Sequence, residues 1–318
     1  MRLLMMGTGP FAVPTFESLL DSEHEVVALV TRPVPPARGR RKTPPNPMRD
    51  VAEARALPIL APDSVNTDAA RQELAIWNPE LFVVCDFGQI LSSATLAVAP
   101  LGGLNLHGSL LPKYRGAAPI NWALYHGEAE TGVTVIHMTP KLDGGPSLAR
   151  DAVRIRPDED AAELEQRLAT LGVKTVRRAL QQLATWDRQS PIGVIQDGSQ
   201  ATKAPRLKKT DGVIDWTRAA SELRNQVRAF KPWPSSYTVW HRREGAPLRL
   251  ILDRVSIAEP DGSSGAPGEI VRVGKRELVV ATGDRLLAID RLQPAGKRPM
   301  EVGEFLRGHR IEPGEFLA

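Results

Sequence analysis

The sequence predicts an α/β domain built on a mostly parallel sheet, followed by a smaller β-barrel domain. In the first half of the chain, apolar runs of strand length alternate with stretches of helical periodicity, a pattern typical of βαβ units. From residue 236 onward, short apolar runs alternate with Gly-containing turns roughly every ten residues, as in small antiparallel barrels. A chain of 318 residues is long enough for both domains to bury cores of their own.

The first half opens with a βαβ pattern. We expect strands at 2–6 and 24–31, joined by a turn at 7–9 and a helix at 11–20. Phe11 stands near the place of the third glycine of the dinucleotide fingerprint, so we expect neither nicotinamide nor flavin. Later helices are predicted at 46–56, 68–77, 119–125 and 161–185, and later strands at 58–60, 81–85, 104–107, 131–138 and 148–155. The last two strands should form an antiparallel pair around the 139–147 loop.

The second half begins after an irregular stretch at 190–206, which we expect to be a linker. Thr217 is the expected N-cap of a helix at 219–230, and the following Lys-Pro-Trp-Pro run ends that helix. Barrel strands are then predicted at 237–240, 248–255, 268–273, 277–282 and 285–292, with a terminal helical turn at 305–310.

Composition favours a soluble intracellular protein. The 42% hydrophobic and 25% charged residues are ordinary for a globular chain, and no segment approaches the length of a transmembrane helix. The single cysteine, Cys85, lies in an apolar run, so we expect a buried, inert thiol and no intrachain disulfide. We therefore expect a cytoplasmic protein that does not bind membranes. We also expect it to be a monomer.

A pair of polar residues marks the end of one predicted strand. Asn105 and His107 alternate with leucines, so both side chains leave the strand on one face. One interpretation is a hydrogen-bonded polar pair, and the other is a pair of donors aimed at an oxygen that becomes negative during acyl transfer. The turn at 141–145 could bring the carboxylate of Asp143 to the same edge of the sheet. Asn, His and Asp would then supply a polariser, an acid/base and a group that orients the His.

A longer block around these residues resembles the folate-dependent formyltransferases. The block reads HGSLLPKYRGAAPIN at 107–121, and ETGVTVIHM and LDGG follow it. GTGPFAVP, IDW, RAFKPWP and LQPAGKRPM extend the likeness over nearly the whole chain. The resemblance implies a Rossmann-like formyltransferase catalytic domain at 1–189, a linker at 190–206 and an OB-like tRNA-binding domain at 207–318.

The resemblance also implies a reaction. The formyl group would pass from 10-formyltetrahydrofolate, as co-substrate and with no metal, to the amino group of methionine carried by initiator tRNA. Asn105 and protonated His107 would donate to the formyl oxygen, while Asp143 keeps the ring charged and helps to move the amine proton. The expected folate-binding residues are Ser109, Leu110, Leu111, Pro112, Phe87 and Gly88. Ordinary core packing accounts equally well for Phe87.

The segment 32–47 carries five cations and six prolines, with no acidic residue. One interpretation is a solvated, semi-rigid loop, and the other is a basic arm that meets phosphates. The resemblance implies an insertion that enters the acceptor stem of the initiator tRNA, with Arg38, Arg40, Arg41 and Lys42 as contacts. From Pro205 onward the chain has 20 Lys and Arg against 15 Asp and Glu, which also favours an anionic partner.

Two other functions remain open at this stage. An enzyme with the same catalytic domain could formylate a sugar-nucleotide amine or glycinamide ribonucleotide, or hydrolyse the formyl folate. Alternatively, the chain could be a non-catalytic RNA-binding protein. The basic segment argues against small substrates, and the presence of Asn105, His107 and Asp143 argues against loss of catalysis.

Overall fold

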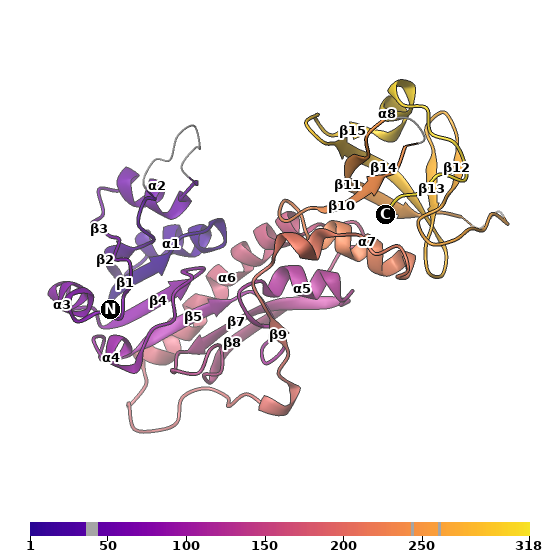
Figure 1. Cartoon of the computed structure of the whole chain (residues 1–318). Helices are drawn as coiled ribbons and strands as arrows, with labels where there is room; N and C mark the ends of the chain where they lie inside the picture. Colours follow the sequence, from indigo (N-terminus) through magenta and orange to yellow (C-terminus); the bar gives the residue numbers. More distant parts are fainter. Residues whose placement is uncertain (36–43, 243–244, 260–261) are drawn as a thin grey trace. The chain divides into compact units, whose positions relative to one another are not determined.

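The computed structural model describes residues 1–35, 44–242, 245–259 and 262–318, and the chain divides into two compact units (Figure 1). The first unit comprises Met1–Pro119, Glu130–Arg154 and Glu165–Pro205. The second comprises Ile120–Ala129, Ile155–Leu164 and Arg206–Ala318. The expected linker at 190–206 therefore belongs, up to Pro205, to the first unit.

In the described part of the chain, the first unit is built on a seven-stranded sheet in the order β3-β2-β1-β4-β5-β7-β8. The first five strands in this order are parallel, and β7 and β8 run antiparallel to their neighbours, which confirms the mostly parallel sheet. Strand order reverses between β1 and β4, so their carboxyl ends define the edge where open α/β sheets bind ligands. The strands are β1 (Arg2–Gly7), β2 (Glu25–Val30), β3 (Ile59–Leu60), β4 (Leu81–Cys85), β5 (Gly103–His107), β7 (Glu130–His137) and β8 (Ser147–Arg154).

Helices cover both faces of this sheet. On one face, Leu74 and Leu96 pack with Phe82 in a single buried cluster. On the other face, Gly172 allows a close approach to Leu106, because a Cβ there would meet Leu106 Cδ2 at 2.5 Å. The helical elements are η1 (Pro10–Ala12), α1 (Val13–Leu20), α2 (Pro47–Ala54), α3 (Asp68–Ile76), α4 (Ser93–Leu96) and α6 (Ala161–Ala184). Of these, the short α4 was not predicted.

The residues after α6 return to the sheet rather than leaving the first unit. Val194 exchanges two backbone hydrogen bonds with Ser147, both 2.8 Å. A short strand β9 (Lys203–Ala204) then pairs in parallel with β6 (Arg115–Gly116). This pairing brings the segment beside the residues that follow β5.

The second unit contains an antiparallel sheet in the order β10-β11-β14-β13-β12, with β15 paired to β14 among the described residues. The carboxyl-terminal residues close this sheet into a barrel. Ala318 exchanges backbone hydrogen bonds with Val239 of β10, while Leu317 N donates to Gly268 O and Ile270 N of β12 to Glu315 O. The strands are β10 (Ser236–Trp240), β11 (Leu248–Ile257), β12 (Ile270–Val273), β13 (Leu278–Ala281), β14 (Leu286–Pro294) and β15 (Met300–Glu301).

Helices α5 (Pro119–Tyr125), α7 (Ala220–Ala229) and α8 (Val302–Gly308), together with η2 (Gly198–Gln200) and η3 (Lys209–Gly212), complete the fold. The prediction of Thr217 as the N-cap of α7 was wrong. Ala219 occupies that position, and its N–H donates to Glu222 Oε2 at 3.2 Å. The Thr217 hydroxyl instead donates to Asp215 Oδ1 at 2.6 Å, two residues before the cap.

Candidate active site

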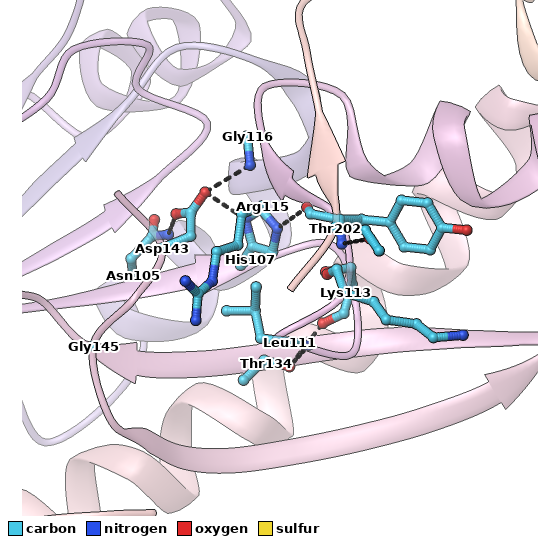
Figure 2. Close-up of polar contacts among 12 residues, drawn as sticks. Asn105, His107, Leu111, Lys113, Arg115, Gly116, Thr134, Asp143, Gly145 and Thr202 are labelled. Carbon is cyan, nitrogen blue, oxygen red and sulfur yellow. Dashed lines mark hydrogen bonds and ion pairs between the residues drawn. The ribbon is translucent and has the colours of Figure 1, made fainter. Parts of the chain in front are cut away.

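The structure brings together the three residues that the sequence predicts as catalytic (Figure 2). Asn105 and His107 lie at the carboxyl end of β5, and Asp143 lies in the loop between β7 and β8. Asn105 Nδ2 donates to Asp143 Oδ1 at 3.3 Å, and His107 Nδ1 lies 3.8 Å from Asp143 Oδ2. The antiparallel pairing of β7 with both β5 and β8 places the loop at this edge.

Both ring nitrogens of His107 face acceptors. Nε2 lies 2.8 Å from the backbone oxygen of Tyr114, and Nδ1 faces the Asp143 carboxylate. A carbonyl oxygen only accepts, so Nε2 carries a proton. The side chain is 6% exposed, so water does little to compete with these partners. The Asp143 carboxylate faces Nδ1 and orients the ring, although Nδ1 lies beyond direct hydrogen-bonding distance of it.

The carboxylate of Asp143 is fixed from several sides. Its Oδ2 accepts from the backbone N–H of Gly116 at 2.9 Å, in addition to the contact from Asn105. The Asp143 backbone has φ +48°, in the left-handed region that costs a non-glycine residue about 1 kcal/mol. Gly145 follows closely, where a Cβ would collide with the carbonyl oxygen of His137.

The loop Ser109–Pro112 is held by a network of hydrogen bonds. Ser109 Oγ donates to Lys113 O at 2.7 Å, and Thr134 Oγ1 donates to Ser109 O at 2.7 Å while accepting from Leu111 N at 3.1 Å. The side chains of Ser109 and Leu111 are buried, whereas Leu110 and Pro112 are half-buried. The loop therefore has a fixed backbone beside His107, with Leu110 and Pro112 partly accessible.

In the loop after β4, Phe87 is buried and Gly88 is exposed. Phe87 is 2% exposed and packs with Leu91 and Val84, so the packing alternative describes its ring. Gly88 is exposed, with φ +78°, and the Arg32 guanidinium lies against it. Any contact of this loop with a pterin ring then falls to its backbone rather than to the Phe87 ring.

Arg38, Arg40, Arg41 and Lys42 lie outside the described residues. The two ends of their segment are joined at the sheet. Asn46 Nδ2 donates to Thr31 Oγ1 at 3.0 Å, and Thr31 Oγ1 donates to Thr8 Oγ1 at 3.3 Å. Thr31 follows β2 and Thr8 follows β1, so the basic segment starts and ends at the carboxyl edge of the parallel strands.

Three groups near the carboxyl end of β4 have shifted acidities. Burial of its carboxylate raises the pKa of Asp86 to about 6, against the lowering effect of Arg32. The residue as a whole is exposed, but the carboxylate packs against Gly9. Burial, and then the charge of Asp86, raise the pKa of Glu165 to about 7. Burial also raises the pKa of the Cys85 thiol well above its usual range, and the thiol is free, as predicted.

The sequence reasoning missed Gln196, which contacts the Asp143 loop. Its Nε2 donates to the backbone oxygens of Asp143 and Gly145. Gln196 stands in an irregular segment 53 residues from Asp143, so no periodicity or local motif points to it. Among the described residues, no group of three or more His, Cys, Asp or Glu could hold a metal ion, and no helix has the length and apolarity needed to cross a membrane.

Comparison with known proteins defines the class of this fold and site. Residues 1–180 match the formyl transferase family, and residues 206–310 match the formyl transferase C-terminal domain. The chain belongs to the formyl transferase family. Methionyl-tRNA formyltransferase of Rhodopirellula baltica is 45% identical over 326 residues, which cover 100% of this chain and 96% of that protein.

Solved structures share the fold at low sequence identity. HypX of Aquifex aeolicus, in complex with tetrahydrofolic acid, has a TM-score of 0.62 and 17% identity, and the match covers 100% of this chain but 50% of HypX. The N-formyltransferase of Helicobacter canadensis, in complex with folinic acid and dTDP-3-aminofucose, has a TM-score of 0.65 and 15% identity over 91% of this chain and 98% of that one. At such identities these structures support the fold alone.

Proposed function

We propose that this protein transfers the formyl group of 10-formyltetrahydrofolate to the amino group of methionyl initiator tRNA, giving N-formylmethionyl-tRNA for translation initiation. The observation that carries the proposal is the meeting of Asn105, His107 and Asp143 at one edge of the sheet. The choice of tRNA as acceptor rests on the full-length similarity to a methionyl-tRNA formyltransferase.

The donor set fits a formyl group. Asn105 and His107 offer N–H groups next to a carboxylate, and donors of this kind stabilise negative charge on a carbonyl oxygen during acyl transfer. Formyl folate supplies an activated one-carbon unit, and Ser109–Pro112 with the backbone of Phe87 and Gly88 would hold it. The amine forms the new C–N bond while the bond from the formyl carbon to the folate nitrogen breaks, so no protein nucleophile is needed.

Protons move in balance with these bonds. The amine loses a proton as it becomes an amide, and the folate nitrogen gains one as it leaves. Asp143 is placed to take up or relay the amine proton, because its carboxylate is fixed by Gly116 and Asn105 beside the charged ring of His107.

The basic segment supports binding of the tRNA acceptor stem. Arg38, Arg40, Arg41 and Lys42 would meet its phosphates, and the Thr31–Asn46 hydrogen bond anchors the segment at the ligand-binding edge of the sheet. We place the protein in the cytoplasm, where its tRNA substrate is charged. We also propose that it acts as a monomer.

A formylation assay tests the function. Purified protein with 10-formyltetrahydrofolate should formylate methionyl initiator tRNA, and it should not formylate glycinamide ribonucleotide or a sugar-nucleotide amine at a comparable kcat/KM. Turnover with a small amine alone would assign the chain to another branch of the family. Absence of turnover with every acceptor would favour a non-catalytic RNA-binding protein.

A further inference from the structure

A single side chain from the expected linker connects two parts of the candidate site. Gln196 Nε2 donates to Asp143 O at 2.8 Å and to Gly145 O at 2.7 Å. Its Oε1 accepts from Arg115, from Nε at 3.2 Å and from a terminal nitrogen at 2.6 Å. Gln196 thus ties the loop that carries Asp143 to the chain that follows the Ser109–Pro112 loop.

These contacts use the full capacity of a primary amide. The NH₂ group has two N–H donors and meets two carbonyl oxygens, and the amide oxygen has two lone pairs and meets two guanidinium donors. The orientation of the amide is therefore determined by its partners. A glutamate of the same shape would keep the Arg115 contact but would place an oxygen against two carbonyl oxygens.

The Asp143 loop needs such support. Asp143 itself has φ +48°, and its neighbour Leu142 is 52% exposed, so local packing contributes little to holding the turn. The contacts to the carboxylate are a 3.3 Å bond from Asn105 and a 2.9 Å bond from Gly116. Gly116 directly follows Arg115, so Gln196 fixes both the loop that carries the carboxylate and the strand that donates to it.

We infer that Gln196 is a positioning residue for catalysis, which acts by holding the Asp143 carboxylate at His107 and Asn105. The inference rests on the proposed function. It assigns the segment 190–206 a part in the active site rather than the role of a passive linker. A displacement of about 1 Å in a reacting group lowers turnover by as much as about 100-fold, so a small backbone movement at Asp143 is enough to matter.

The test compares Gln196→Ala and Gln196→Glu with the wild-type protein. Both variants should lower kcat by about 10- to 100-fold while KM for formyl folate and for tRNA stays within about threefold. Gln200→Ala is the matched control, because Gln200 lies in the same segment and donates to the exposed Asp197. The control should keep wild-type kcat, and far-ultraviolet circular dichroism should show that all three variants are folded.

A double-mutant cycle with Asp143→Asn separates positioning from a general structural effect. If Gln196 acts through the Asp143 carboxylate, adding Gln196→Ala to Asp143→Asn should change kcat by less than about twofold. A further loss of tenfold in that background, or wild-type kcat in both Gln196 variants, would overturn the inference alone. Wild-type kcat in Asp143→Asn would overturn the catalytic assignment together with it.

Discussion

At the scale of single residues, the proposed chemistry depends on how the ring of His107 is held. Its side chain is 6% exposed, and its ring lies between the backbone oxygen of Tyr114 and the carboxylate of Asp143, which fix its orientation. Asn105 shares that carboxylate, so its amide is oriented by the same group. The carboxylate of Asp143 thus orients the side chains of both Asn105 and His107.

Removing any of the three polar groups should depress turnover without unfolding the protein. We expect Asn105→Ala, His107→Ala and Asp143→Asn each to lower kcat by about 10²–10³-fold, the usual cost of losing one preorganised donor or its support. Single-turnover formylation of methionyl initiator tRNA measures the chemical step. Asp63→Asn, at an exposed carboxylate in another loop, serves as the control and should remain at wild-type rate. Three variants with wild-type turnover would contradict the assignment.

At the scale of elements, the longer strands were predictable, whereas the loops and the two-residue strands β6, β9 and β15 were not. β4 reads as an unbroken apolar run, and its observed bounds, Leu81–Cys85, are those predicted. Helix α4 escaped prediction because four residues give no periodicity. The N-cap of α7 was misplaced because Asp284, 64 residues away, accepts from Ala220 N at 2.8 Å. Contacts between distant segments also position Gln196, and no local pattern encodes them.

The turn that carries Asp143 offers a matched pair of glycines. In Gly145→Ala the new Cβ would collide with the His137 carbonyl oxygen, which belongs to strand backbone and cannot move freely. In Gly144→Ala the three nearest atoms to the new Cβ would all belong to the flexible side chain of Lys141, the closest at 2.7 Å. We expect Gly145→Ala to lower kcat at least about tenfold and Gly144→Ala to have little effect. Equal activities in the formylation assay would show that the turn does not transmit strain to Asp143.

Asn46 combines two roles at the base of the basic segment. It caps α2 by accepting from Arg49 N at 3.1 Å, and it donates to Thr31. Asn46→Ala should therefore cost about 1 kcal/mol of stability and also raise KM for tRNA. Thr67→Ala removes an equivalent cap from α3, where Ala70 N donates to Thr67 Oγ1 at 3.2 Å. Thr67→Ala should lose a similar amount of stability but keep the wild-type KM for tRNA, which would show that the Asn46–Thr31 hydrogen bond contributes to tRNA binding. Equal KM values in the two variants would refute that contribution.

At the scale of the whole molecule, the surplus of positive charge favours binding of an anionic partner. The net charge is +4, and the carboxyl-terminal part and the 32–47 segment hold the surplus of cations. Phosphate contacts by such cations release counterions, so binding weakens linearly in log affinity with log salt. Both units can contribute to this electrostatic term, whereas the residues proposed for the chemical step all lie in the first unit.

Salt dependence therefore distinguishes the basic segment from the catalytic groups. Replacing Arg38, Arg40, Arg41 and Lys42 with Gln should weaken tRNA binding at low salt. It should also reduce the slope of log affinity against log salt by about one for every phosphate that the variant no longer neutralises. Asp143→Asn changes a proposed catalytic group rather than a proposed phosphate contact, so it should leave that slope unchanged. Filter binding across a salt series gives both slopes, and an unaltered slope in the four-fold variant would count against binding of the acceptor stem by this segment.

Stability should fall as pH rises through the range in which Glu165 ionises. Its pKa is about 7 in the folded protein, against 4.5 for a free glutamate, so between these values the folded state binds more protons than the unfolded state. The free energy of unfolding therefore decreases with rising pH over this window, and the loss is complete above about pH 7.

Glu165→Gln stays neutral, so it should be more stable than wild type at pH 8 and equal to it at pH 4. Because the side chain is partly exposed and screened, we expect a gain of about 1 kcal/mol rather than the full value of the shift. Urea denaturation at both pH values measures this, with the exposed Glu73→Gln as control. A gain of the same size at pH 4 would mean that the substitution acts through packing and not through ionisation.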